Sequence, residues 1–328
     1  MAASAAIPVI DLAGALESGG SASEAVAGKM RIAAMATGFF HVKNHGVPAE
    51  RIDQQFELAL QLMELPLATH QALAIHHSKT MRGFEALGAQ TLDETARPDL
   101  KECFYCGMAY PVNHPYVLAG YQTYGGNQWP TEQPQAPAQC EAYIQSLLGL
   151  SRRLMQLLAL SLHLPEAYFD ATSHSPMVTL RMIRYPAHPP DADDRTFGAG
   201  AHTDWGALTL LAQDAHGGLE VCLPNGSWLA APPMPNTFIV NLGDMMPRWT
   251  NGRYLSSLHR VRNTLSGGQA RYSIPFFYEP DYLALIEAVP GTLAEGDKPL
   301  FEPCTAGEHL KQMYQKTYGL VALSQVAA

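Results

Sequence analysis

Residues 202–211 have the sequence HTDWGALTLL, and the expected fold is built around this stretch. Side chains at positions i and i+2 point to the same side of a strand, whereas in a helix they diverge by about 200°. His202 and Asp204 can therefore approach one metal ion only from an extended segment, and Ala207 to Leu211 is typical of a strand. A third ligand must come from elsewhere, and His259, which opens another strand-like run, is the candidate.

The histidine-aspartate motif by itself leaves two interpretations open. Two imidazoles and one carboxylate on one side of a metal are typical of non-haem Fe(II) oxygenases. However, a chain with 13 histidines is expected to contain about one His-x-Asp/Glu pattern by chance. His202 and Asp204 could therefore be ordinary polar strand residues. A second feature favours the metal site. Arg271 and Ser273 share one side of a later strand-like run, and a guanidinium beside a hydroxyl can clamp a small carboxylate.

Further motifs extend the pattern over nearly the whole chain. They are IPVIDL (7–12), GFFHVKNHGV (38–47), KECF (101–104), RYP (184–186), HTDWGALTLL (202–211), NLGD (241–244), LHRV (258–261) and RYSIPFF (271–277). In this order they resemble the isopenicillin N synthase-like branch of the Fe(II)/2-oxoglutarate-dependent dioxygenases. The motifs are specific for the family and not for a substrate.

The resemblance implies an α+β fold with a mainly β core, a distorted double-stranded β-helix (jelly roll) with flanking helices. It also implies roles for individual residues. His202, Asp204 and His259 would be the catalytic Fe(II) ligands, and Arg271 and Ser273 would bind the distal carboxylate of 2-oxoglutarate. Tyr185 matches a family tyrosine that contacts 2-oxoglutarate or substrate, although a half-buried strand aromatic is the alternative reading.

The substrate pocket is less well defined by the sequence. The aromatic candidates for its lining are Phe104, Trp205 and Phe277, each of which could instead be a core residue. Three cations could meet an acidic substrate or could be surface charges: Arg82, Arg97 and Lys101. The pair Cys103 and Cys106 has neither a second such pair nor the context of a redox motif, and we interpret it as structural.

The pattern of elements predicts four regions. Residues 1–120 form an N-terminal dioxygenase region of helices and short strands, and residues 121–176 a connecting segment with a long supporting helix. Residues 177–290 form the double-stranded β-helix that carries Fe(II) and 2-oxoglutarate, and residues 291–328 a C-terminal helix and tail. Repeated short strands separated by turns after residue 177 favour a sandwich or barrel for the third region.

Helices are expected at four places along the chain. The stretches are about 21–37, 48–65, 137–164 and 306–317. Ser21 and Glu24 predict a capping box for the first. In the second, Ile52, Phe56 and Met63 fall on one apolar stripe that should face the core.

Composition limits the partners and the compartment. The 328 residues carry a net charge of −9 and contain no run of Lys or Arg, which disfavours nucleic acid and an anionic membrane surface. Five cysteines without a disulfide spacing, and no signal-peptide pattern, favour the cytoplasm. We expect a small-molecule substrate and no obligate protein partner. Metalloprotease, esterase and nucleotide-binding motifs are absent from the sequence.

The predicted function is oxidation of a small organic molecule by a non-haem Fe(II)/2-oxoglutarate-dependent dioxygenase. Its cofactors are Fe(II), 2-oxoglutarate and O₂, with ascorbate as a candidate reductant, and its products include succinate and CO₂. Hydroxylation is the expected reaction, and desaturation or cyclisation are alternatives. Two rival functions remain: a 2-oxoglutarate-independent iron oxidase of the isopenicillin N synthase type, and a non-catalytic jelly-roll binding module.

Overall fold

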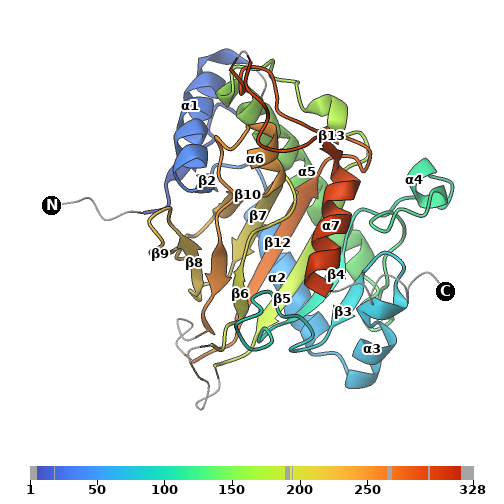
Figure 1. Cartoon of the computed structure of the whole chain (residues 1–328). Helices are drawn as coiled ribbons and strands as arrows, with labels where there is room; N and C mark the ends of the chain where they lie inside the picture. Colours follow the sequence, from blue (N-terminus) through green and yellow to red (C-terminus); the bar gives the residue numbers. More distant parts are fainter. Residues whose placement is uncertain are drawn as a thin grey trace.

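A computed structural model describes residues 6–17, 19–188, 193, 195–263, 268–294 and 296–318 (Figure 1). The strands are β1 (Val9–Asp11), β2 (Phe39–Lys43), β3 (Gly83–Glu85), β4 (Glu102–Cys106), β5 (Met177–Tyr185), β6 (Ala199–His202), β7 (Leu208–Gln213), β8 (Leu219–Cys222), β9 (Trp228–Ala230), β10 (Phe238–Leu242), β11 (His259–Val261), β12 (Arg271–Glu279), β13 (Leu285–Ile286) and β14 (Cys304–Thr305). The α-helices are α1 (Gly20–Ala36), α2 (Ala49–Met63), α3 (Leu67–Ala72), α4 (Pro115–Leu118), α5 (Ala136–Ser161), α6 (Met245–Trp249) and α7 (Ala306–Tyr318), with 3₁₀ turns η1 (Ile75–His77) and η2 (Asp170–Thr172).

Two facing sheets form the core. The larger has eight strands in the order β1-β2-β10-β7-β12-β5-β4-β3, and the smaller has four in the order β6-β11-β8-β9. Apolar side chains from both sheets, among them Ile183, Ile239, Val221 and Val261, form one buried cluster between them. This architecture confirms the predicted double-stranded β-helix with flanking helices. Strands β1 to β4, from the N-terminal third of the chain, extend the larger sheet at both of its edges.

Helices cover the other face of the larger sheet. Figure 1 shows α2 and α5 behind β12 and β5, and α7 in front of them. Helix α5 contacts α1, α2, β7 and β12, which explains why leucines recur nearly all round it. A helix that is packed on several sides can be apolar on several sides, because little of its apolar surface is exposed to water. The length of α5 and its contacts with helices and strands confirm the long supporting helix expected from the sequence.

Each central strand of the larger sheet divides its side chains between two environments. On β5, Leu180 and Met182 belong to the helix-side core, whereas Thr179 and Arg181 line a cavity between the sheets. Strands β7, β10 and β12 show the same division, because successive side chains of a strand point to opposite faces. We call these two surfaces the helix face and the cavity face.

The four expected helices are present, with one error at a terminus. Helix α1 begins at Gly20 and its N-cap is Gly19, so Ser21 lies inside the first turn and no capping box forms. Gly19 has a φ of 86°, which favours glycine there. In α2, Met63 is buried while Ile52 and Phe56 pack partly buried against the same core, as the apolar stripe predicts.

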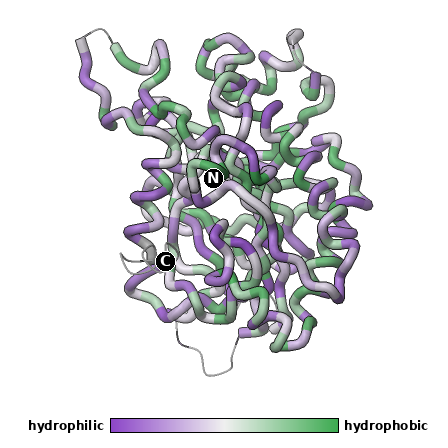
Figure 2. The backbone as a smooth tube through the Cα atoms, turned by 90° about the vertical axis from the view of Figure 1, so that its right-hand side faces the viewer, coloured by the Kyte–Doolittle hydropathy of each residue, from purple (hydrophilic) through white to green (hydrophobic). Residues whose placement is uncertain are grey.

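Hydrophobic stretches of the chain are short. Figure 2 shows hydrophilic and hydrophobic segments alternating along the tube. Among the described residues, no helix combines the length and apolar character needed to cross a membrane.

Candidate active site

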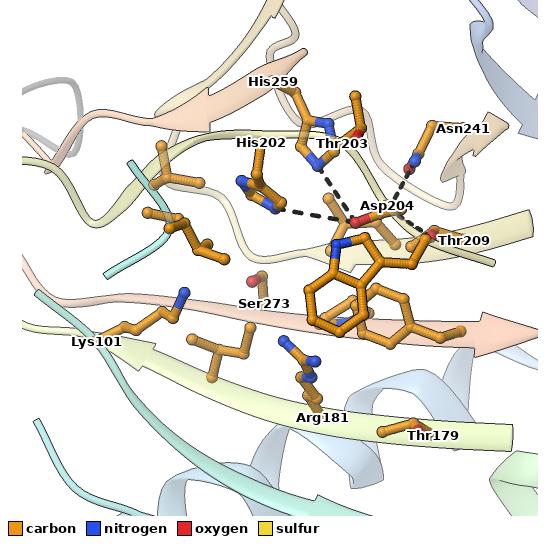
Figure 3. A pocket seen from close by; sticks show the side chains of 18 of the residues that line it. Lys101, Thr179, Arg181, His202, Thr203, Asp204, Thr209, Asn241, His259 and Ser273 are labelled. Carbon is orange, nitrogen blue, oxygen red and sulfur yellow. Dashed lines mark hydrogen bonds and ion pairs between the residues drawn. The ribbon is translucent and has the colours of Figure 1, made fainter. Parts of the chain in front are cut away.

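Three side chains meet at the rim of the cavity between the sheets (Figure 3). His202 lies at the end of β6 and His259 at the start of β11, and the two residues are direct partners across this antiparallel pair. The Oδ1 atom of Asp204 lies 3.9 Å from Nε2 of His202 and 3.6 Å from Nε2 of His259. One potential ligand atom from each residue lies within 4.8 Å of the other two. This spacing is suited to one metal ion bound from one side.

Hydrogen bonds orient all three side chains toward the same point. The Nδ1 atom of His202 bonds the carbonyl of Gly200 at 2.7 Å, and Nδ1 of His259 bonds the carbonyl of Ser257 at 3.2 Å. A carbonyl can only accept, so both Nδ1 atoms carry the proton and both Nε2 lone pairs remain available for a metal. On Asp204, Oδ2 accepts bonds from Asn241 and Thr209, which leaves Oδ1 facing the imidazoles.

The protonation states also suit a divalent cation. Burial, together with the neighbouring His259, lowers the pKa of His202 to about 3. Burial alone would raise the pKa of Asp204, but the two imidazoles and the bonds from Asn241 and Thr209 bring the net shift below the ordinary value. At neutral pH His202 is therefore neutral and the carboxylate of Asp204 is ionised, as metal coordination requires.

Two glycines allow the chain to bring Asp204 into this position. After β6 the backbone turns tightly, and the carbonyl of Asp204 accepts a bond of 2.8 Å from the amide of Asp244. A Cβ atom on Gly243 would lie 2.3 Å from the carbonyl oxygen of Gly206, and one on Gly206 would lie 2.6 Å from Cγ of Glu279. Position 243 therefore requires glycine, whereas a side chain at position 206 would displace the side chain of Glu279. This explains the glycines in the 202–211 and 241–244 motifs.

A second group of predicted residues lines the same cavity at the beginning of β12. Arg271 and Tyr185 are direct partners across the β5–β12 ladder, and Ser273 follows on the same face. The guanidinium of Arg271 stacks over the ring of Tyr185, with 4.8 Å between its Cζ and the ring centroid. Its Nη2 donates to the side chain of Gln213 at 2.9 Å.

Arg271 retains unused hydrogen-bonding capacity. It is only 1% exposed, yet Nε and Nη1 have no hydrogen-bond partner among the residues that the structure describes. A buried guanidinium with two unmatched N–H donors is costly unless a ligand satisfies them. The donor set therefore fits a carboxylate held in the bidentate geometry that guanidinium favours.

The predicted pocket aromatics have two different outcomes. Trp205 and Phe277 line the cavity. Phe104 does not line the cavity, so its predicted place in the pocket was wrong. It lies on the opposite face of β4. It is 2% exposed in the helix-face core and stacks against Trp129 at 5.9 Å, whereas its neighbour Tyr105 belongs to the cluster between the sheets.

The three candidate cations from the irregular region are all committed to protein partners. Arg82 is buried and donates to the carbonyls of Gly125, Met108 and Thr123. Arg97 is exposed and pairs with Asp193. Lys101 does line the cavity, but its ammonium lies 2.7 Å from the buried carboxylate of Asp99.

Several residues of the site were missed at the sequence level. Asn241 and Thr209, which hold Asp204, belong to the 241–244 and 202–211 motifs, but the sequence predicted no role for either residue. Arg181 and Glu279 also line the cavity and were not predicted. Strand alternation is consistent with their positions, because counting in twos from Arg271 along β12 reaches Glu279, and counting in twos back from Tyr185 along β5 reaches Arg181.

Comparisons with known proteins agree with this geometry. A model of the 2OG-Fe(II) oxygenase superfamily matches residues 175–280, and one of the N-terminal region of a non-haem dioxygenase in morphine synthesis matches residues 7–132. The 2-oxoglutarate-Fe(II) type oxidoreductase hxnY of Emericella nidulans is 35% identical, over 95% of this chain and 90% of the relative. The 2-oxoglutarate-dependent dioxygenase caaD of Aspergillus niger is 34% identical, over 95% and 92%.

Among solved structures, a full-length Neurospora crassa protein in complex with alpha-KG (2-oxoglutarate) and thymine superimposes with a TM-score of 0.83 at 27% identity. The match covers 94% of this chain and 96% of that one. These likenesses favour a 2-oxoglutarate-dependent enzyme over both rival functions, the 2-oxoglutarate-independent oxidase and the binding module. The protein is therefore an oxidoreductase that uses Fe(II), 2-oxoglutarate and O₂ to oxidise a small organic molecule. The chain belongs to the 2OG-Fe(II) oxygenase superfamily.

Proposed function

We propose that His202, Asp204 and His259 hold the catalytic Fe(II), and that Arg271, Ser273 and Tyr185 hold 2-oxoglutarate. The observation that carries the proposal is the buried guanidinium of Arg271, which lies in the cavity that also contains the histidines and Asp204. Within the described part of the chain, its Nε and Nη1 have no hydrogen-bond partner. Arg271 and the hydroxyl of Ser273 would bind the distal carboxylate, and the other end of 2-oxoglutarate would reach the metal.

The bound iron and co-substrate supply an oxidation in which a C–H bond becomes C–OH while 2-oxoglutarate and O₂ become succinate and CO₂. The protein's own contribution is positioning and exclusion of water. Asn241 and Thr209 hold Asp204, and carbonyls of the backbone hold both imidazoles. Leu310 and Tyr314 from α7, together with Gln90 and Leu92 from the N-terminal region, complete the cavity lining.

The proposal keeps the division of the chain into regions 1–120, 121–176, 177–290 and 291–328. It is supported by the position of α5, which separates the two parts of the chain matched by the family models. We further propose a cytoplasmic enzyme whose partner is a small-molecule substrate rather than nucleic acid, a membrane or an obligate protein. The five free cysteines support a reducing compartment.

An anaerobic titration tests the proposal. Addition of Fe(II) and then 2-oxoglutarate should produce the weak visible charge-transfer band of the chelate. Arg271→Leu should bind Fe(II) normally and require about 10- to 100-fold more 2-oxoglutarate, because a charge-assisted bidentate contact is lost. The matched control is Arg184→Leu, which removes a partly exposed guanidinium that pairs with Glu102 outside the cavity. An unchanged 2-oxoglutarate requirement in Arg271→Leu would remove this residue from its role.

A further inference from the structure

The strand that carries His202 is incompletely held by its own sheet. Strand β6 lies at the edge of the smaller sheet, and among the described strands only β11 pairs with it. The register of this pairing shifts between Ala199 and His202, so two residues of β6 lie opposite one residue of β11. Such a bulge interrupts the ladder hydrogen bonds, and an edge strand has no second neighbour to replace them. Gly200 lies within this irregular part, two residues before His202.

A buried carboxylate from the N-terminal region supplies a partner to this part of β6. Oδ1 of Asp99 accepts a hydrogen bond of 2.9 Å from the amide of Gly200. The carbonyl of Gly200 in turn accepts the 2.7 Å bond from Nδ1 of His202. Hydrogen bonds to a charged acceptor are stronger than those between neutral groups. Asp99 therefore holds the backbone of the residue that orients the imidazole.

Lys101 compensates the charge of this carboxylate. Its Nζ lies 2.7 Å from Oδ2 of Asp99, and the two side chains are 4% and 0% exposed. An isolated carboxylate at this depth would be costly, whereas a hydrogen-bonded ion pair is tolerated. Each oxygen of Asp99 thus has its own donor, Lys101 on one and Gly200 on the other. Figure 3 shows Lys101 reaching into the cavity on the same side as His202.

The segment that contains Asp99 packs directly on the backbone of β6. A Cβ atom on Gly200 would lie 2.8 Å from Cβ of Asp93 and 2.9 Å from its backbone nitrogen, so any larger residue at this position would push the two segments apart. The amide of Leu100 also donates to the carbonyl of Phe197 at 2.9 Å. Residues 93–101 therefore brace the part of the chain that leads into β6.

We propose, on the basis of the function proposed above, that Asp99 is a positioning residue for the metal site and that Lys101 keeps its carboxylate in place. Asp99 fixes the backbone of Gly200, and the carbonyl of Gly200 fixes the plane of the His202 imidazole, so that Nε2 faces the metal. The pair acts through this backbone and not as a metal ligand. The N-terminal region, which a separate family model matches, thus contributes to metal binding in addition to covering the cavity.

Two double variants of equal charge test this role in the full-length protein. Asp99→Asn with Lys101→Met removes both charges but leaves a side-chain oxygen that can accept from Gly200, whereas Asp99→Ala with Lys101→Met removes the acceptor as well. Both charges are removed together because a single substitution would leave the other charge buried and unpaired. Fe(II) affinity is measured by anaerobic titration, and the visible absorption bands of the Co(II)-loaded protein report the ligand geometry around the metal.

We expect the alanine double variant to bind Fe(II) about 10- to 100-fold more weakly than wild type and to show altered Co(II) bands. The asparagine double variant should keep nearly the wild-type affinity and the wild-type bands. Gly200→Ala, which retains both side chains but separates the segments, should also weaken Fe(II) binding. The matched control is Arg97→Met, which removes an exposed guanidinium that joins the same two segments through Asp193, and it should bind Fe(II) like wild type.

Three results would overturn the inference while leaving the proposed function in place. They are wild-type iron affinity and Co(II) bands in the alanine double variant, the same in Gly200→Ala, and a loss of about 10-fold or more in the asparagine double variant. Circular dichroism shows which variants are folded, and Gly200→Ala and the asparagine double variant decide the outcome if the alanine double variant is not. Failure of the wild-type protein to bind Fe(II) would instead remove the proposed function, and the inference with it.

Discussion

The two faces of the eight-stranded sheet carry opposite kinds of side chain on the same strands. On the helix face of β12, Ile274 and Phe276 are fully buried among apolar groups. On its cavity face, Arg271, Ser273 and Glu279 are also buried, at 1%, 1% and 8% exposure. Burial of apolar groups stabilises the fold, whereas burial of charged or polar groups costs stability unless they are paired.

This difference separates stability from function within single strands. Apolar packing on the helix face stabilises the fold. This stabilisation offsets the cost of burying charged and polar groups on the cavity face. Substitutions on the cavity face should therefore change binding and turnover more than stability, and substitutions on the helix face should do the reverse. Four substitutions test this division.

Asp204→Ala should have the largest effect. It removes the anionic member of the candidate metal site, so we expect Fe(II) binding to weaken by more than the roughly 10- to 100-fold typical of lost supporting contacts, with turnover undetectable. Fe(II) affinity and succinate release are the measurements, and circular dichroism checks that the variant is folded. Full iron affinity with normal turnover would show that Asp204 is not a ligand.

Asn241→Ala should have a smaller effect on the same property. The amide of Asn241 donates to Oδ2 of Asp204 at 2.7 Å, so its loss allows the carboxylate to rotate away from the imidazoles. We expect Fe(II) affinity to fall by about 10- to 100-fold, while saturating iron restores most of the turnover. A variant whose activity is not recovered by iron would indicate a different role for Asn241.

Glu279→Gln should increase stability in a pH-dependent manner. Burial raises the pKa of Glu279 from 4.5 to about 8, so between these values the folded protein retains a proton that the unfolded chain has released. The contribution of Glu279 to wild-type stability should therefore be full below pH 4.5 and fall through this window, by at most about 1.4 kcal/mol per pH unit. The variant lacks this titration, so its free energy of unfolding should increase relative to that of wild type as pH rises.

Urea denaturation at several pH values measures this gain. Glu302→Gln, which changes an exposed carboxyl, is the control and should follow wild type. A constant difference between Glu279→Gln and wild type across the window would show that Glu279 titrates normally.

Phe104→Leu should have the smallest functional effect. The side chain is packed in the helix-face core, so we expect a loss of about 1–2 kcal/mol in the free energy of unfolding from imperfect repacking. The KM values for 2-oxoglutarate and substrate should stay unchanged. A changed substrate KM with unchanged stability would place Phe104 in the pocket, as the sequence first suggested.

The sequence alone determined the features that depend on local spacing. Alternation in twos placed Arg271 with Ser273 on one strand face, because side-chain direction in a strand is set by the backbone itself. It also predicted that His202 and Asp204 approach one point, although Asp204 lies beyond the end of β6. The same local rules identified α2, α5 and α7 and the strands from β5 onward, apart from the short β6, β9, β13 and β14. Arg181 and Glu279 followed the same alternation, but no local feature distinguished them from surface charges.

Only the tertiary structure decided which faces meet. Which side chains of β4 face the helices, and therefore whether Phe104 packs against Trp129, depends on how the strand pairs with β5. The pairing of Lys101 with Asp99 and the stacking of Arg181 between Tyr105 and Phe277 likewise arise from contacts between distant segments. Burial and charge compensation are properties of the assembled fold, so the complete lining of the cavity could not be derived from the sequence by itself.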